Sequence, residues 1–318
     1  MPNDPIPTEH SAGAIKDQPA HSQFDPAAAL VYASFIDRAY DMLADVKRTK
    51  NRPPQPANFP AGFRMTAWIT MADFAIFGET YRTFYGYVAT EIDDPFSHVI
   101  VIRGTGPHIE LWDNLVLRPV TFKPVPSAGR VHAGFYRIYR TMEVTPVTRP
   151  AAVPPRKGAP RVAPATFAEQ IERLAPTLAQ EHAAAPNGHD GKHHFIVTGH
   201  SLGAALCTLY VMEHAVRKQQ DRHRRVTIER LCTFASPRVG MQEFAEQFDP
   251  LEIDAWRIQN TWDLVPRVPP EWMSFQHVRD HNLFRLPGAA NFNPVHSHSM
   301  GTYERWLQGM LARGAPPE

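Results

Sequence analysis

Phe195-Ile196-Val197-Thr198-Gly199-His200-Ser201-Leu202-Gly203 is the stretch of sequence that decides the fold. Its first four residues are apolar or β-branched and predict a buried strand, and the apolar residues after Ser201 recur at helical spacing. A strand that turns directly into a helix crowds its own backbone, so residues without side chains are needed at Gly199 and Gly203. Such a turn exposes the hydroxyl group at its centre. We therefore interpret Ser201 as a catalytic nucleophile.

The G-x-S-x-G pattern is a weak signal by itself, because about one chain in ten of this length contains it by chance. The predicted change from strand to helix is what gives it weight. Since Leu202 opens the predicted helix, its backbone N–H has no partner within the helix and lies at the positive helix end. We expect this N–H to stabilise a negative oxygen on the substrate.

The composition excludes several classes of protein. The 318 residues are 43% hydrophobic and 20% charged, which suits one large α/β domain or two small ones. A formal net charge of +1 gives no electrostatic footprint for nucleic acid. No apolar run approaches the roughly 18 residues that span a bilayer, so we expect a soluble protein without a transmembrane segment. Cys207 and Cys232 are expected to be small core residues.

Two segments differ from the rest of the chain. Residues 1–24 are polar and contain several prolines, and they predict a flexible leader before a single domain at 25–318. The leader shows no apolar signal-peptide core, which leaves a cytoplasmic location or secretion, with the signal removed or by another route, both open. Residues 144–164 hold six prolines and few apolar anchors, and they predict a surface insert.

Upstream of Ser201, residues 83–90 and 98–103 predict two strands, while residues 63–77 are ambiguous between helix and strand. The second strand leads into Arg103-Gly104-Thr105-Gly106. Ligands of α/β proteins bind at the ends of the sheet strands. Thr105 lies at such an end and can offer both a backbone N–H and a hydroxyl to an oxyanion. An ordinary turn is the alternative interpretation, which the presence of Ser201 disfavours.

Downstream, residues 256–260 predict a short strand that leads to Asp263. An aspartate just past a strand end, held by the nearby Pro266, can be aimed rigidly at an imidazole. Asp263 is therefore the predicted acid of the site. Three competing aspartates lie in helix–loop or turn-like surroundings and are interpreted as solvated: Asp249, Asp254 and Asp280.

The general base is expected in residues 293–300, a predicted loop before a terminal helix at 301–312. It carries His296 and His298, which lie on the same side if the loop is extended, but no further metal ligands accompany them and no metal is predicted. Two other candidates, His277 and His281, lack a following helix that would fix them. The order serine, acid, histidine is that of α/β-hydrolases and differs from the two large serine-protease folds.

The chain resembles the class 3, fungal-type triacylglycerol lipases from about residue 81 to residue 306. The resemblance rests on motifs that follow one another in the family order: Tyr85-Gly86-Tyr87-Val88, Ile102-Arg103-Gly104-Thr105, Val131-His132-Ala133-Gly134-Phe135, the Ser201 motif, 233–240 and 260–270. It implies an α/β-hydrolase fold, with a central, mostly parallel sheet flanked by helices in a single domain with a short lid. It also implies Ser201 as nucleophile, Asp263 as acid and His298, in an H-x4-Y pattern, as base.

The resemblance further implies an oxyanion hole formed by Thr105 and the Leu202 amide, and a lid at about 106–115. The lid and substrate-binding residues are then Leu111, Trp112, Leu115 and His200. A lid of this kind can cover an apolar pocket in water and expose it at a lipid surface. A short fixed helix that only shapes the pocket is the alternative. The chain departs from the family in the insert 144–164, in lacking the disulfides of the secreted members, and in offering His296 as a rival base.

The function expected from these residues is the hydrolysis of carboxylic esters, most simply of triacylglycerols, without cofactor or metal. Feruloyl esterases and phospholipases A1 share the fold and the motifs, and the sequence does not separate them. A non-catalytic lipase-like binding module is disfavoured, because all three triad residues are present. The expected partners are a lipid or ester substrate and a lipid–water interface, and the oligomeric state is left open.

Overall fold

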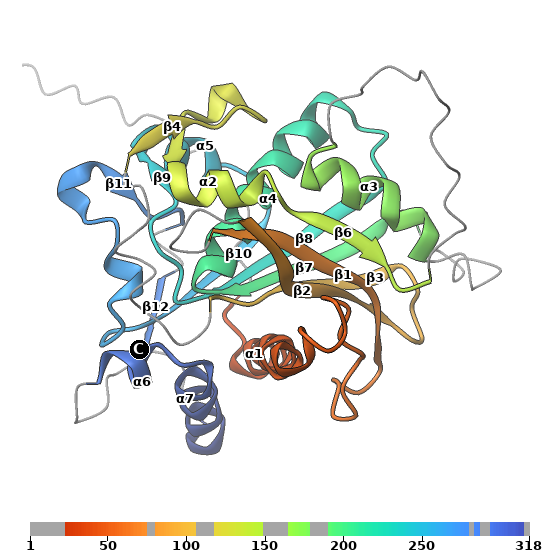
Figure 1. Ribbon diagram of the computed structural model, residues 1–318. Helices are drawn as coiled ribbons and strands as arrows, with labels where there is room; N and C mark the ends of the chain where they lie inside the picture. Colours follow the sequence, from red (N-terminus) through yellow and green to blue (C-terminus); the bar gives the residue numbers. More distant parts are fainter. Residues whose placement is uncertain are drawn as a thin grey trace, which may run out of the picture.

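The computed structural model describes residues 23–74, 80–105, 118–148, 165–178, 190–279, 283–286 and 293–314. Within them, helices cover both faces of a central sheet of eight strands in the spatial order β12-β10-β8-β7-β3-β2-β1-β6 (Figure 1). Its strands are β1 (Phe63–Phe74), β2 (Thr80–Glu91), β3 (Ser97–Ile102), β6 (Glu143–Pro146), β7 (His193–His200), β8 (Val226–Phe234), β10 (Asp254–Asn260) and β12 (Leu283–Leu286).

Strand β7 lies near the middle of the sheet and determines where Ser201 emerges. The strands β3, β7, β8, β10 and β12 are parallel to one another, whereas β2, β1 and β6 continue the sheet in antiparallel pairings. Because both faces of β7 are covered, its sequence is apolar over consecutive positions rather than alternating. The carboxyl end of β7, where Ser201 follows, lies at the same edge as the carboxyl ends of its parallel neighbours.

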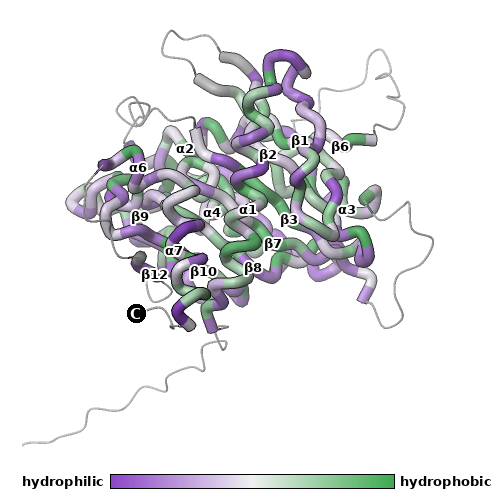
Figure 2. Tube along the Cα trace, turned by 90° about the horizontal axis from the view of Figure 1, so that it is seen from below, coloured by the Kyte–Doolittle hydropathy of each residue, from purple (hydrophilic) through white to green (hydrophobic). Residues whose placement is uncertain are grey.

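The helices form two layers, each over its own hydrophobic core. One core packs against α2 (Ala133–Tyr139), α3 (Phe167–Leu178), α4 (Leu202–Gln220) and α5 (Gln242–Phe248). The other core packs against α1 (Pro26–Asp41) and α7 (Met300–Arg313), which lie over the opposite face (Figure 2). A small antiparallel sheet of β11 (Phe275–Gln276), β9 (Gly240–Met241), β5 (Arg130–His132) and β4 (Pro119–Thr121) completes the described fold.

Three predicted segments are sharpened or changed by the structure. The ambiguous segment 63–77 forms β1 as far as Phe74. The predicted surface insert at 144–164 is wrong for its first residues, because 144–146 belong to β6, which pairs with β1 at the sheet edge; a proline at position 146 is tolerated on such an edge strand. Residues 149–164 lie outside the described residues. Phe24, at the end of the predicted leader, is buried and stacks on Phe284.

The predicted loop at 293–300 is instead largely helical. The Asn293 side chain accepts a hydrogen bond from the His296 N–H at 3.1 Å and Pro294 occupies the first turn, so α6 (Pro294–His298) begins there. Two positions along a helix are separated by about 200° of rotation. His296 and His298 therefore point to different sides, whereas the extended chain assumed from the sequence would have placed them on one side.

Two expectations from composition can be compared with the described residues. Cys207 and Cys232 are free thiols buried in the core, as predicted. In the part of the chain that the structure describes, no helix is both long and apolar enough to cross a membrane.

Candidate active site

Ser201 occupies a strained turn between β7 and α4. Its backbone has φ 58° and ψ −123°, a combination that costs an L-residue about 1–3 kcal/mol. A Cβ atom added to Gly199 would lie 2.7 Å from the carbonyl carbon of Gly203, and one added to Gly203 would lie 2.1 Å from the carbonyl oxygen of Ile102. Both glycines are therefore required by close backbone approach, which confirms the reason given for them from the sequence.

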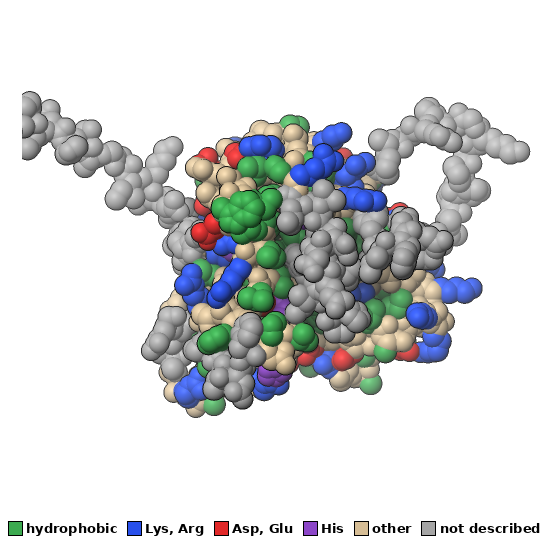
Figure 3. Space-filling view, turned by 60° about the vertical axis from the view of Figure 1, so that its left-hand side comes forward, with side chains coloured by type: hydrophobic (Ala, Val, Ile, Leu, Met, Phe, Trp, Pro, Cys, Tyr) green, Lys and Arg blue, Asp and Glu red, His purple; other side chains and the backbone are tan. Residues whose placement is uncertain are grey.

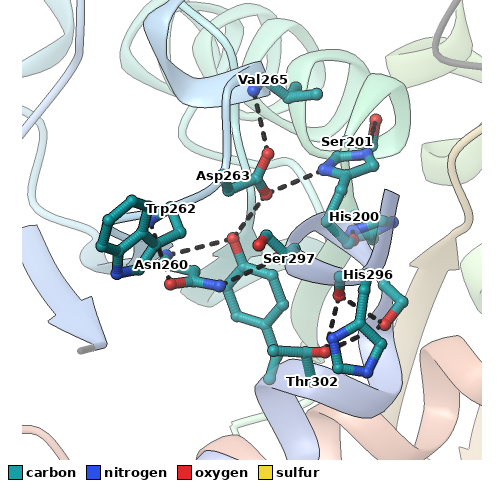
Figure 4. Close-up of polar contacts among 12 residues, drawn as sticks. His200, Ser201, Asn260, Trp262, Asp263, Val265, His296, Ser297 and Thr302 are labelled. Atoms are coloured by element: carbon teal, nitrogen blue, oxygen red, sulfur yellow. Dashed lines mark hydrogen bonds and ion pairs between the residues drawn. The ribbon is translucent and has the colours of Figure 1, made fainter. Parts of the chain in front are cut away.

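His298 lies between Ser201 and Asp263, with one ring nitrogen directed at each (Figure 4). Its Nε2 is 2.9 Å from the Ser201 Oγ, and its Nδ1 is 2.8 Å from the Asp263 Oδ2. Since the carboxylate accepts a hydrogen, Nδ1 carries the proton and Nε2 presents its lone pair to the serine hydroxyl. The three residues named from the sequence are thus brought together in the arrangement that activates a serine.

Asp263 is fully buried and its carboxylate accepts three hydrogen bonds. The Val265 N–H donates to Oδ1 at 2.9 Å, and the Tyr303 hydroxyl donates to Oδ2 at 2.8 Å, beside the bond from His298. Hydrogen bonds to a charged acceptor are stronger than those between neutral groups. They offset the cost of burying a charge and fix the direction in which the carboxylate faces His298.

A second residue, Asn260, connects the strand that leads to the acid with the helix that carries the base. Its backbone N–H donates to the Tyr303 hydroxyl at 3.1 Å, and its side-chain amide donates to the Ser297 carbonyl at 3.0 Å. Tyr303 therefore accepts from the end of β10 while it donates to Asp263. The H-x4-Y pattern pointed to Tyr303 in the sequence, but no sequence signal identified Asn260.

The two segments that carry the predicted oxyanion donors, Leu202 and Thr105, border Ser201. Leu202 is the first residue of α4, so its N–H lacks a partner within the helix. Gly104 packs directly against the serine, because a Cβ added to it would lie 2.8 Å from the Ser201 Cβ. Thr105 follows Gly104 and is partly exposed.

His200 lies beneath the site rather than in the path of a substrate. It is only 3% exposed, and both ring nitrogens are bonded to protein: Nε2 donates to the His298 carbonyl at 2.8 Å, and Nδ1 accepts from the Tyr40 hydroxyl at 2.7 Å. Tyr40 in turn accepts the Gly104 N–H at 2.9 Å. Burial, with a smaller effect from His298, holds the pKa of His200 well below its ordinary value, so the ring is neutral.

This arrangement corrects the sequence-based assignment of His200 to substrate binding, since the ring has no nitrogen left for a ligand. It also adds Tyr40 of α1, which none of the sequence motifs above includes. Burial raises the pKa of Tyr40 to about 12, so its hydroxyl stays protonated and able to donate. Tyr40 lies 160 residues from His200, and no local pattern indicates that they meet.

The competing candidates lie elsewhere. His296 is exposed and accepts a hydrogen bond from the Arg305 guanidinium at 2.9 Å. Asp254 pairs with Arg230, Asp249 accepts the Arg279 N–H, and the ring of His277 donates to a backbone carbonyl. Among the described residues no three His, Cys, Asp or Glu side chains are grouped to hold a metal ion. Several predicted positions lie outside the described residues: Leu111, Trp112, Leu115, Asp280 and His281.

Comparison with known proteins places this arrangement in a family. The family model described as Lipase (class 3) matches residues 99–273, more than half of the chain, and includes Ser201, Asp263 and the strand that leads to Thr105. The chain belongs to the class 3 lipase family. Family membership accounts for the order of the motifs along the chain, and it agrees with the resemblance found in the sequence.

Two curated relatives extend the comparison beyond the matched region. A phospholipase A1-Igamma2 of Arabidopsis thaliana is 26% identical over 264 residues, which cover 79% of this chain and 44% of the relative. A lipase of Rhizopus niveus is 27% identical over 192 residues, which cover 60% of this chain and 39% of the relative. This class 3 lipase chain therefore spans less than half the length of either relative.

Among solved structures, the M37 lipase aligns with a TM-score of 0.57 at 17% identity, over 92% of this chain and 95% of that one. At this identity the comparison concerns the fold alone. The predicted α/β-hydrolase fold, with its mostly parallel sheet flanked by helices, is confirmed.

Proposed function

We propose that the protein is a serine carboxylic-ester hydrolase that cleaves acylglycerol esters, with triacylglycerols as its main substrate class. The observation that carries the proposal is the unbroken chain of hydrogen bonds that connects Ser201 to His298 and His298 to the buried Asp263. The names of the relatives, a lipase and a phospholipase A1, support a fatty-acyl ester as the bond that is cleaved.

In the first half of the reaction, the Ser201 Oγ attacks the ester carbonyl while His298 Nε2 takes the hydroxyl proton. The imidazolium that forms is stabilised by the Asp263 carboxylate through Nδ1. The carbonyl oxygen becomes negative in the tetrahedral intermediate, where the Leu202 N–H and Thr105 act as its donors. His298 then passes the proton to the leaving alcohol, and the acyl group remains on Ser201.

In the second half, water takes the place of the alcohol. His298 removes a proton from the water, the resulting hydroxide attacks the acyl-enzyme carbonyl, and the fatty acid leaves when the proton returns to the Ser201 Oγ. The hydrogen bond from His200 to the His298 carbonyl holds the backbone of the base during both transfers. Apart from the water, both half-reactions use groups that the chain itself supplies.

Phospholipase A1 activity is the second candidate. The observation that favours it is the match with the Arabidopsis thaliana phospholipase A1-Igamma2, which covers more of this chain than the match with the Rhizopus niveus lipase does. Both activities cleave a fatty-acyl ester of glycerol and use the same triad. They differ in whether the pocket accepts a phosphate-bearing headgroup beside the scissile bond.

Replacement of Ser201 tests the proposal. The Ser201→Ala variant should lose p-nitrophenyl ester hydrolysis and covalent labelling by a fluorophosphonate probe. The matched control Ser34→Ala should retain both, because Ser34 lies on α1 and its hydroxyl donates to the Val31 carbonyl. Turnover by Ser201→Ala above a trace would refute the assignment. A wild-type protein that is not labelled would instead indicate a binding module.

The substrate class is tested by comparing emulsified triacylglycerol with dispersed phosphatidylcholine at equal ester concentration. Faster fatty-acid release from triacylglycerol is expected. Faster release from phosphatidylcholine would move the assignment to phospholipase A1, and a strong preference for short soluble esters would move it to an esterase.

A further inference from the structure

A cavity of about 420 Å³ lies beside the loop that carries Asp263. Its lining includes Gln259 at the end of β10 and Arg285 in β12, together with residues of the segment that follows the acid. Because β10 and β12 are parallel, these residues lie near the edge of the sheet at which the triad is assembled. None of the lining residues belongs to the triad.

Positive charge exceeds negative charge around this cavity. Three arginines line it, Arg238, Arg267 and Arg285, with Glu271 as the acidic residue among the described lining. Arg238 is nearly buried and pairs with Glu271, which offsets its charge. Arg267 and Arg285 form no ion pair with any residue that the structure describes, so among the described residues two arginines of this cavity have no acidic partner.

The backbone around the cavity is fixed by the arginines themselves. Arg238 donates to the carbonyls of Arg267 at 2.7 Å and Pro269 at 3.0 Å, and Arg267 donates to the Thr261 carbonyl at 2.8 Å across the acid loop. The nearby His277 adds no charge, because its pKa is held well below the ordinary value. Burial is the main cause, and the positive charges of Arg257, Arg238 and Arg285 add to it. The excess charge therefore belongs to the arginines.

Large apolar side chains are exposed around the same loop. Trp272, which lines the cavity, is 82% exposed, and Trp262 and Leu264 on either side of Asp263 are 43% and 41% exposed. Figure 4 shows Trp262 pointing away from Ser201. Single exposed apolar residues are common on protein surfaces, but here three large ones lie within one short stretch of the chain, between positions 262 and 272. Figure 3 shows apolar and basic side chains mixed on the side that carries β11 and β12.

We propose that the acid-loop surface, formed by Trp262, Leu264, Arg267, Trp272 and Arg285, docks on a lipid bilayer that carries anionic phospholipid headgroups, with a headgroup phosphate in the arginine-lined cavity. The proposal rests on the proposed function, because an enzyme for water-insoluble esters meets its substrate at a lipid surface. A guanidinium matches a phosphate with two parallel hydrogen bonds. Tryptophan prefers the headgroup level of a bilayer, which a free phosphate in solution does not provide.

Vesicle sedimentation tests the docking surface without using turnover. The protein carries Ser201→Ala so that the lipid stays intact, and it is mixed with vesicles of phosphatidylcholine alone or with 30% phosphatidylglycerol. Binding should be tighter to the anionic vesicles. The Arg285→Glu variant lowers the net charge of this surface by two units. Each unit of charge near the bilayer changes the binding constant about fivefold, so binding to the anionic vesicles should weaken about 25-fold. The matched control is Arg222→Glu, an exposed arginine near the amino ends of β7 and β8, which should change binding less than twofold.

A second variant separates docking from simple attraction between charges. Trp272→Ala should weaken binding to both kinds of vesicle, by up to about tenfold, because an apolar side chain is removed from the interface. Equal binding to neutral and anionic vesicles, or equal effects of Arg285→Glu and Arg222→Glu, would overturn the proposal. Inorganic phosphate should not release the protein from the vesicles more than NaCl of the same ionic strength does. Release by phosphate alone would show a site for free phosphate instead.

The catalytic proposal is tested apart from this surface. With Ser201 restored, Arg285→Glu and Trp272→Ala should hydrolyse a soluble p-nitrophenyl ester at the wild-type rate. If the wild-type enzyme cleaves no ester yet still binds anionic vesicles, the proposed function fails and the docking surface stands. If ester cleavage is normal but vesicle binding shows no preference, the docking surface fails alone.

Discussion

Removal of the Tyr40 hydroxyl should lower catalysis although Tyr40 touches no triad residue directly. The hydroxyl accepts the Gly104 N–H at 2.9 Å and donates to His200 Nδ1 at 2.7 Å. Since His200 Nε2 donates to the His298 carbonyl at 2.8 Å, one hydroxyl connects the predicted oxyanion strand with the backbone of the base. In Tyr40→Phe, both contacts are lost and nothing else in the side chain changes.

The magnitude follows from the number of polar groups left without partners. A buried group that loses its hydrogen bond costs about 1–3 kcal/mol, so the Gly104 N–H and His200 Nδ1 together should lower the free energy of unfolding by about 2–6 kcal/mol. A misplacement near 1 Å of a catalytic group can cost about 100-fold in rate. We expect kcat to fall about 10- to 100-fold with little change in KM, because the lost contacts position reacting groups and do not bind substrate.

The assay combines urea unfolding with kcat and KM on a soluble p-nitrophenyl ester. Tyr32→Phe is the matched control, because Tyr32 lies on the same helix and is buried. Its hydroxyl accepts a hydrogen bond of 3.0 Å from Arg230, which is not part of the triad. This control should lose stability and keep its kcat. A Tyr40→Phe enzyme that is destabilised but turns over at the wild-type rate would refute the positioning role and leave Tyr40 as a structural residue.

Three further outcomes are expected. Thr105→Val should lower kcat by up to about 10²–10³-fold if its hydroxyl contacts the oxyanion, and an unchanged kcat in steady-state assays would remove it from that role. His298→Ala should abolish turnover, whereas His296→Ala should leave it near the wild-type value, because His296 is exposed and bonded to Arg305; the reverse result would exchange their roles. The pKa of His98 is held well below 6.5, mainly by burial and then by the neighbouring His193. The neutral ring therefore contributes folding stability above about pH 6.5, and this stability is lost as the pH falls below that value. Urea unfolding from pH 7.5 to 5 should show a smaller loss of stability in His98→Gln than in the wild type, and parallel curves would contradict this.

The sequence predicted those parts of the site that depend on local backbone geometry. Gly199 and Gly203 were required by the turn at Ser201, and the structure confirms the close contacts that exclude side chains there. Asp263 could be chosen because a strand end and a proline are adjacent in sequence. His298 could be separated from His296 only by the family pattern, since the Asn-Pro start of α6, which separates them in space, was interpreted as part of a loop.

The residues that sequence reasoning missed act over long distances along the chain. His200 was named among the substrate-binding residues, but as the last residue of β7 it turns into the protein and is 3% exposed. Its two partners, Tyr40 and the His298 carbonyl, come from opposite ends of the domain. A tyrosine on an apolar helix face is normally part of the core, and periodicity carries no information about where its hydroxyl points.

The division of the site between the two helix layers follows from these contacts. Ser201 and the Leu202 N–H belong to the β7–α4 turn, whose helix covers one face of the sheet. Tyr40 and Tyr303 belong to α1 and α7 on the other face, and from there they orient His200 and Asp263. One layer therefore supplies the attacking group and the other fixes the proton-transfer groups, so changes that loosen α1 against α7 should slow proton transfer while the nucleophile stays in place.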